Sequence, residues 1–414
     1  VFEVVDKDVA SVTGNVLTGL KEGTTEIKVT TEGEEWTTII LNVIDTTLAP
    51  MPPTEDDEEE ELPSIPPTET EGEWKKVNSI AELKGVWEYT EKTNAEGDEV
   101  VVLDKYVASA ENTKVEIPRV LDGKPVELEG FSSDMFPNVT HIKIADGDKS
   151  KKVKLRTESL YGDYGFFRNK QIEYLDLRGL DVSKVTNFYY TFGGCSNLQY
   201  ANFGGWNFAD GANLSNLISN NHNLHTLDLS EWNLVNANTT DLITNDTGLR
   251  NLILKDMNKS TFADLVNEAK GTEFQELTID STGLDLTNVT SLENMFNGAS
   301  GVVEIKGLDK WDVSSVTNMA SLFKNASNLT NLEDIEDWNT SSLTNAQEMF
   351  SGVSSLESLD LTNWNMENVT ELSWMFLNCS SLTELKGTEN WTLSKVTRMR
   401  NVFEGTKLNV IDLS

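Results

Sequence analysis

Tryptophan recurs along the second half of this 414-residue chain at a nearly constant interval. Six of the ten tryptophans take part, namely Trp206, Trp232, Trp311, Trp338, Trp364 and Trp391. Successive members are one interval of about 26 apart, except that Trp232 and Trp311 are three such intervals apart. A fixed period of this length is the signature of a solenoid, in which one supersecondary unit stacks on the next copy of itself. The sequence therefore predicts a repeat array instead of one compact core.

A large apolar residue usually follows the tryptophan at one fixed distance, as Phe350 follows Trp338. These anchors are Ile218, Phe323, Phe350, Phe376 and Phe403, and Ile243 arrives one position early. With Phe136, Phe167, Phe192, Val266 and Phe296 they define about eleven units. Val266 comes early after Ile243 and leaves a long step to Phe296, so we expect a kink, bulge or longer loop there. The fixed spacing predicts that tryptophans and anchors alike belong to the repeat core.

The most regular unit spans residues 356–379. Leucines on an LxxLxL pattern, beginning at Leu356, predict a short strand. Val369, Leu372 and Phe376 then fall on one face of a two-turn helix. Each unit is thus expected to read strand, turn, short helix, turn, which makes the fold class an α/β solenoid with an N-terminal cap.

Short polar residues and cysteines also keep the repeat phase. The residue after the tryptophan is Asn207, Asn233, Asp312, Asn339 or Asn365, with Thr392 as the exception. Such side chains bond turn amides, so we expect a structural ladder there. Cys195 and Cys379 occupy the same position in repeats that are seven units apart. At the spacing of adjacent strands this separation exceeds ~30 Å, which is too far for a disulfide bond. We therefore expect both cysteines to be buried, unpaired core residues.

The charge limits the possible partners. Acids outnumber bases 68 to 33, which gives a net charge of −35. Nucleic-acid binding depends on clustered Lys and Arg, so we expect neither nucleic acid nor anionic membrane as a direct partner. No stretch approaches the ~20 apolar residues of a membrane span, and we expect no membrane insertion. Since the chain starts without Met and stops within a repeat, we expect it to be a piece of a longer protein.

Composition divides the chain into four parts. Residues 1–45 read as short strands. Residues 46–73 form an acidic, proline-rich linker that contains no Lys or Arg. Residues 74–130 look like the cap of the solenoid and contain a hairpin turn at Asp122-Gly123, and residues 131–414 are the repeats.

The repeats resemble the BspA-type leucine-rich repeats of bacterial surface proteins, in the variant with a period of about 26 that is found in Gram-positive bacteria and Mycoplasma lipoproteins. The segments SSVTNMASLF (314–323) and ENVTELSWMF (367–376) carry the resemblance most closely. It implies a leucine-rich-repeat-like stack and a role in surface adhesion, without fixing a ligand.

The first part of the chain resembles a different family. VASVTGNVLTGLKEGTTEIKVT (9–30) is similar to the second half of a bacterial Ig-like domain of group 2. Only the C-terminal half of such a domain is present, so the resemblance implies a partial all-β Ig-like module.

The outward position beside the inward strand leucine is the candidate partner-binding strip. It consists of Asp176, Asn202, Asp228, Thr278, Lys306, Glu333, Asp360 and Lys386, with Ile253 and Asp412 in the same phase. Carboxylates dominate the strip, but the two lysines interrupt them. The strip is therefore also consistent with an ordinary solvent-exposed surface that has no partner. The sharper hypothesis is that this sheet face binds a protein or glycan.

Catalytic and cofactor signatures are missing from the sequence. The three histidines have no third ligand at metal-site spacing, and no phosphate loop or nucleophile elbow occurs. We therefore expect no enzyme, no metal and no cofactor. The interpretation is an extracellular bacterial surface protein, anchored to wall or lipid in its full-length form, that adheres to host or microbial protein or glycan. A structural stalk is the alternative, and a degradative enzyme is a third class.

Overall fold

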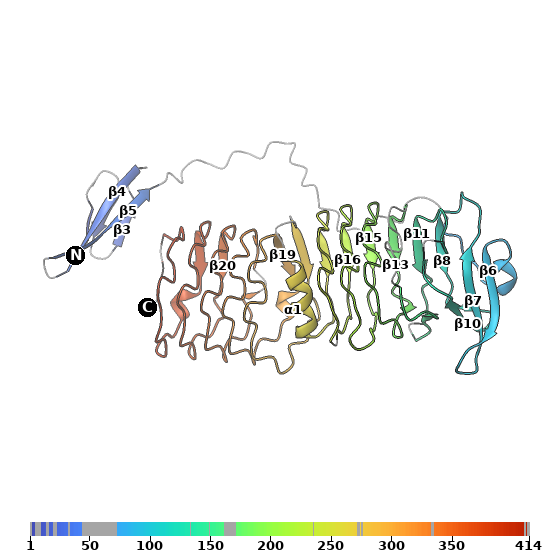
Figure 1. Ribbon diagram of the computed structural model, residues 1–414. Helices are drawn as coiled ribbons and strands as arrows, with labels where there is room; N and C mark the ends of the chain where they lie inside the picture. The colour runs from blue at the N-terminus through green and yellow to red at the C-terminus, as the bar shows by residue number, and fades with distance from the viewer. Residues whose placement is uncertain are drawn as a thin grey trace. The chain divides into compact units, whose positions relative to one another are not determined.

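The computed structural model describes two compact units, residues 1–65 and 66–414, which are treated separately below (Figure 1). Described are residues 73–409 and 411 except 133, 149, 161–170, 235, 271–273, 275 and 333–334 and, before them, the backbone of five strands. Most of the expected linker, residues 46–72, and the anchor Phe167 lie outside the described residues.

The first unit consists of antiparallel strands. They are β1 (Phe2–Val4), β2 (Ala10–Thr13), β3 (Val16–Gly19), β4 (Gly23–Thr31) and β5 (Glu34–Val43). β4 pairs with both β1 and β5, while β2 and β3 form a separate hairpin.

The second unit is a solenoid of stacked coils (Figure 1). One parallel sheet runs through β8 (Lys114–Ile117), β11 (His141–Ile144), β13 (Tyr174–Asp176), β15 (Tyr200–Asn202), β16 (Thr226–Asp228), β17 (Asn251–Ile253), β18 (Leu277–Asp280) and β19 (Val302–Lys306). Farther along, β20 (Ser358–Asp360) and β21 (Glu384–Lys386) pair in parallel. Residues one repeat apart are direct partners, as in Tyr174 beside Tyr200 and Tyr200 beside Thr226.

A second sheet begins the solenoid. Its strands are β6 (Trp87–Thr93), β7 (Glu99–Tyr106), β9 (Val120–Leu121), β10 (Lys124–Leu128), β12 (Val153–Leu155) and β14 (Leu180–Asp181). The 3₁₀ helix η1 (Ile80–Leu83) precedes β6, and β6 forms the antiparallel edge beside β7. The hairpin turn expected at Asp122-Gly123 is confirmed, because β9 and β10 pair antiparallel across it and both turn residues have positive φ.

The expectation of a two-turn helix in every unit is wrong. Among the described residues the α-helix is α1 (Lys259–Glu268), and η2 (Leu308–Lys310) and η4 (Thr388–Asn390) are single 3₁₀ turns. The amides of Trp374 and Phe376 donate to carbonyls of the next coil, at 2.7 and 2.8 Å, instead of to residue i−4. Trp374 also has a φ of 61°, which a right-handed helix does not contain.

Two left-handed residues recur in each unit where the helix was expected. The first positions are Asn294, Ser321, Glu348, Trp374 and Asn401, and the second are Gly298, Asn325, Gly352, Asn378 and Gly405. The second set consists only of Gly and Asn, the residues that tolerate positive φ best. A Cβ on Gly352 would lie 2.5 Å from the Asn325 side chain of the preceding coil. The alternation of Asn and Gly therefore follows from close stacking of coils.

The six periodic tryptophans are core residues, as the repeat phase predicted. All are 4% exposed or less. Their rings stack where coils adjoin: the Trp311–Trp338 and Trp338–Trp364 centroids are 5.8 and 6.1 Å apart. The anchors Phe296, Phe323, Phe350, Phe376 and Phe403 form a second stack with spacings of 5.3–5.7 Å. Two parallel aromatic ladders thus fill the interior of the solenoid.

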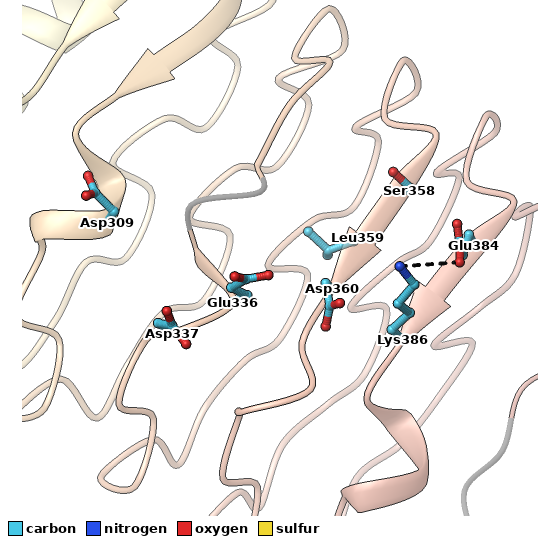
Figure 2. Close-up of a pocket in the computed structure, with 8 residues that line it drawn as sticks. All are labelled: Asp309, Glu336, Asp337, Ser358, Leu359, Asp360, Glu384 and Lys386. Carbon is cyan, nitrogen blue, oxygen red and sulfur yellow. Dashed lines mark ion pairs between the residues drawn. The ribbon is translucent and has the colours of Figure 1, made fainter.

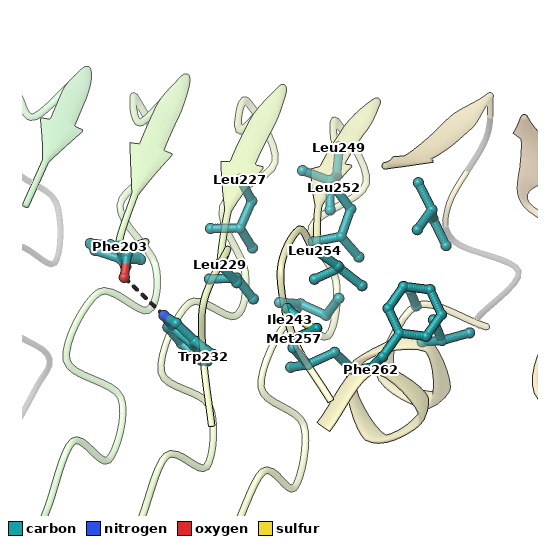
Figure 3. Packing of buried hydrophobic residues seen from close by; sticks show 14 of the residues in the cluster. Phe203, Leu227, Leu229, Trp232, Ile243, Leu249, Leu252, Leu254, Met257 and Phe262 are labelled. Atoms are coloured by element: carbon teal, nitrogen blue, oxygen red, sulfur yellow. Dashed lines mark hydrogen bonds between the residues drawn. The ribbon is translucent and has the colours of Figure 1, made fainter. Parts of the chain in front are cut away.

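The indole N–H groups tie each coil to an earlier one. Trp232 donates to the Phe203 carbonyl at 2.8 Å (Figure 3), and Trp364 donates to the Ile335 carbonyl at the same distance. The indole nitrogen of Trp391 is buried without a hydrogen-bond partner. Trp391 therefore contributes packing alone.

The irregular stretch between Trp232 and Trp311 is where the repeat changes, as expected. Met257 takes the phase of the missing tryptophan, and α1 follows it directly (Figure 3). Phe262 of α1 lies edge-on to Trp311, with centroids 6.2 Å apart, and Val266 is fully buried. The pairing of β18 with β19 shifts register between Leu277 and Thr278, which is the expected bulge.

The polar ladder and the cysteines have structural roles. Asp312 and Asn365 accept the backbone amide two residues on, Ser314 at 3.1 Å and Glu367 at 2.9 Å, so they stabilise turns mainly within their own coil. Cys195 and Cys379 are free and fully buried, as expected, and burial raises the pKa of each thiol to about 12.

Replacing Trp364 by Phe should destabilise the solenoid more than replacing Trp391 by Phe. Both changes remove a similar buried volume, but only Trp364→Phe removes a hydrogen bond to a neighbouring coil, worth about 1 kcal/mol. Urea unfolding followed by circular dichroism measures the difference. Equal losses in the two variants would show that the indole hydrogen bond adds nothing beyond packing.

Candidate functional site

The register of the parallel sheet brings the predicted strip together as a row on its outward face. Asp176, Asn202, Asp228 and Ile253 are consecutive partners in β13 to β17. Lys306 of β19 continues the row, and Asp360 and Lys386 are partners in β20 and β21. Glu333 and Asp412 lie outside the described residues. We call this set the outward row.

One member of the predicted strip is misplaced. Asp280, and not Thr278, stands between Ile253 and Lys306, while Thr278 pairs with Asn251 and Glu304 two residues earlier in each strand. The segment LTID offers two buried residues with an outward neighbour, Leu277 and Ile279. The second one aligns with the row because β17 pairs with β18 in a register that sets Leu252 beside Ile279 and Ile253 beside Asp280.

Several residues of the row serve the turn that follows the strand. Oδ1 of Asp228 accepts the Ser230 amide at 2.9 Å and the Ser230 hydroxyl at 2.6 Å. Asp360 accepts the Thr362 amide at 2.9 Å and its hydroxyl at 2.5 Å. These bonds from Thr362 hold the pKa of the Asp360 carboxyl below its usual range. The short polar residue at the strand end is therefore first a structural requirement of the turn.

Two residues of the row are covered instead of outward and free. Asp176 and Asn202 are only 6% and 3% exposed. Both Asp176 oxygens accept from the Arg178 guanidinium, at 2.8 and 2.6 Å, and Asn202 donates to the Tyr200 hydroxyl at 3.2 Å. The members that remain accessible to a partner begin with the half-buried Asp228.

Two hollows open along the outward row. The C-terminal hollow, of about 400 Å³, is lined by Asp309, Glu336, Asp337, Ser358, Leu359, Asp360, Glu384 and Lys386 (Figure 2). Lys386 lies 3.5 Å from Glu384, which leaves this hollow strongly acidic. The N-terminal hollow, of about 490 Å³, is lined by Arg119, Ile144, Asp146, Gly147, Lys152, Asp176, Arg178, Gly179, Gly204, Gly205, Asn207, Asp228, Ser230, Glu231, Lys255 and Asp256.

An aromatic group near the start of the sheet was not predicted. The rings of His141, Tyr174 and Tyr200 stack in successive strands, 5.7 and 4.7 Å apart, and Trp74 meets His141 edge-on. The Lys143 ammonium lies 4.3 Å from the Trp74 ring centroid. Burial lowers the pKa of His141 to about 4. The signal was present in the sequence, since Tyr174 and Tyr200 keep the repeat phase.

Within the described part of the chain, no cluster of three or more His, Cys, Asp or Glu side chains has the geometry to hold a metal ion. None of the helices in that part is long and apolar enough to cross a membrane.

Comparison with known proteins places the repeats in a family. The sequence model described as "Mycoplasma protein of unknown function, DUF285" matches residues 163–275, 261–381 and 290–414, which together cover more than half of the chain. The chain belongs to the DUF285 family. The DUF285 matches span the regular coils, so the expectation of a bacterial repeat family represented in Mycoplasma is confirmed. No curated protein matches the chain.

Among solved structures, an internalin from Listeria monocytogenes is similar to this DUF285 chain. The identity is 13% and the TM-score 0.24, over 73% of this chain and 85% of the internalin chain.

Replacing Asp360 by Ala should destabilise the fold, whereas replacing it by Asn should not. Asn retains an oxygen that accepts the Thr362 amide, and Ala leaves this turn without its side-chain bond, at a cost of about 1 kcal/mol. Urea unfolding of the two variants measures the difference. If Asn costs as much as Ala, the charge and not the acceptor geometry stabilises the turn.

Proposed function

We propose that this chain is a ligand-binding protein of a bacterial surface, and that the outward face of its parallel sheet contacts a host or microbial protein or glycan. The observation that carries this proposal is the position of the two hollows. Both are lined by residues of the outward row, and one continuous face therefore offers recessed, charged sites many coils apart.

Cell-surface adhesion and an extracellular location are part of the same proposal. The strands of residues 1–45 would form a partial bacterial Ig-like module that spaces the solenoid from its anchor, and that anchor would be wall or lipid. The resemblance to BspA-type repeats supports adhesion, and the DUF285 match supports a bacterial repeat protein. No catalytic role is proposed.

A structural stalk is the second candidate, and one observation favours it. The carboxylates of Asp228 and Asp360 accept turn hydrogen bonds, and Asp280 forms an ion pair with Lys255 at 2.9 Å. A face whose charges are used by its own coils is what a spacer requires.

The test measures binding of the full chain to an array of glycans and matrix proteins. The double variant Asp228→Asn and Lys386→Gln changes one residue in each hollow and keeps the turn acceptor at position 228. We expect binding to an identified ligand to fall by about tenfold or more.

The matched control is Asp312→Asn. Asp312 accepts the Ser314 amide in the same kind of turn but lines neither hollow, so its variant should bind normally. Absence of any ligand for the unmodified chain would favour the stalk. Equal binding by all variants would remove the sheet face from the proposal.

A further inference from the structure

We propose that the N-terminal hollow binds an acidic sugar, with Arg119 and Lys152 receiving its carboxylate or sulfate group. This inference rests on the proposed function, because it assigns a ligand class to one part of the same face.

The end of this hollow that carries Arg119 and Lys152 belongs to the least acidic part of the solenoid. Residues 105–184 contain 14 Lys and Arg against 13 Asp and Glu, whereas residues 185–414 contain 12 against 29. In a chain with a net charge of −35, the coils that carry Arg119 and Lys152 are thus the part that repels an anion least.

Two cations of the hollow have no carboxylate partner. Arg119 donates through Nε to the Ala145 carbonyl at 2.6 Å and through Nη1 to the Lys151 carbonyl at 3.2 Å. Lys152 donates to the Gly205 carbonyl at 2.6 Å. Within the described residues neither forms an ion pair, in contrast to Arg178 with Asp176 in the same hollow.

The Arg119 side chain is fixed in place with donors to spare. Its two backbone bonds hold the guanidinium plane, and Nη2 lies only 2.5 Å from the point where a Cβ on Gly179 would stand. A guanidinium has five N–H donors and the two backbone bonds use two of them, so donors remain for a planar or tetrahedral anion. Partial burial lowers the pKa of Arg119, and the nearby carboxylates of Asp146, Asp176 and Asp148 counteract this only in part.

The opposite end of the hollow has the reverse character. The strand order β11, β13, β15, β16, β17 places Arg119 and Gly147 at the first coils and Asp228, Glu231 and Asp256 at the later ones. These carboxylates would repel a ligand with several negative charges, but they accept hydrogen bonds from hydroxyl groups. A body rich in hydroxyls with a single anionic group fits both ends, and about 490 Å³ is the size of a small-ligand site.

The experiment compares ligands that differ only in the anionic group. The full chain is titrated with glucuronic acid, a sulfated galactose, the corresponding neutral sugars and inorganic phosphate, and sugar resonances are followed by saturation-transfer NMR. Phosphate binding is measured by its competition with the acidic sugars. We expect saturation transfer for the two acidic sugars, little for the neutral sugars and no competition from phosphate. The relative response of the two acidic sugars separates carboxylate from sulfate preference.

Lys152→Gln and Arg119→Gln are the test variants, and Lys310→Gln is the matched control. Lys310 carries the same charge but lines neither hollow. We expect each test variant to weaken binding of the acidic sugars by about tenfold, with the control unchanged. Because Arg119 also bonds two backbone carbonyls, the result for Arg119→Gln is interpreted only if circular dichroism shows that the variant is folded. Lys152→Gln tests the inference independently.

Three outcomes would overturn the inference. They are equal binding of acidic and neutral sugars, equal binding of free phosphate, and an equal loss in Lys310→Gln. If array ligands depend on Lys386 and Asp228 but not on Lys152, the proposed binding face stands and the acidic-sugar site is wrong. If no ligand binds at all, both proposals fail.

Discussion

The solenoid depends on how its backbone amides are satisfied between coils. Within one coil the backbone bonds outside the strands are short turns, such as the Cys379 amide to the Phe376 carbonyl. In the sheet the amides donate to the coils on both sides, as the Leu229 amide bonds Ile253 and the His225 amide bonds Gln199. In the segment around Phe376 they donate forward, to Val402 and its neighbours. Because buried amides must be paired, each coil requires its neighbouring coils, and stability is shared between them.

This constraint explains the aromatic core. Coils joined by backbone bonds place equivalent side chains directly over one another, so the flat rings of Trp and Phe stack in register, with Trp338 at 5.8 and 6.1 Å from its two neighbours. In the unit where Met257 replaces the tryptophan, the core has a smaller side chain at that position. There α1 contributes Phe262, which is buried and lies edge-on to Trp311. The irregular unit therefore fills the core by a different route.

The sequence was sufficient to predict the repeat length, the core residues and the position of the irregular unit. This is because a buried Trp or Phe occupies the same position in each coil and so marks the repeat directly. It misled on the segment after Val369, because residues at i, i+3 and i+7 also face inward in a turn that bonds forward. The Gly and Asn series ending at Gly405 contradicted a helix, since only positive φ explains that choice at every repeat. Thr278 was misplaced because the segment LTID has two inward apolar residues, Leu277 and Ile279, and alternation alone does not tell which outward neighbour continues the row.

The outward row shows why sites on repeat proteins are hard to assign from phase alone. A residue at a repeated position has the same structural role in each coil. At the end of the strand, Asp228 and Asp360 accept the backbone amides of Ser230 and Thr362, and this role explains why Asp occurs there. Residues outside the recurring positions do not have this structural role. Arg119 and Lys152 belong to no recurring position, and their side chains reach across coils to carbonyls of other segments. In a solenoid, such departures from the repeat distinguish a binding site from the scaffold that presents it.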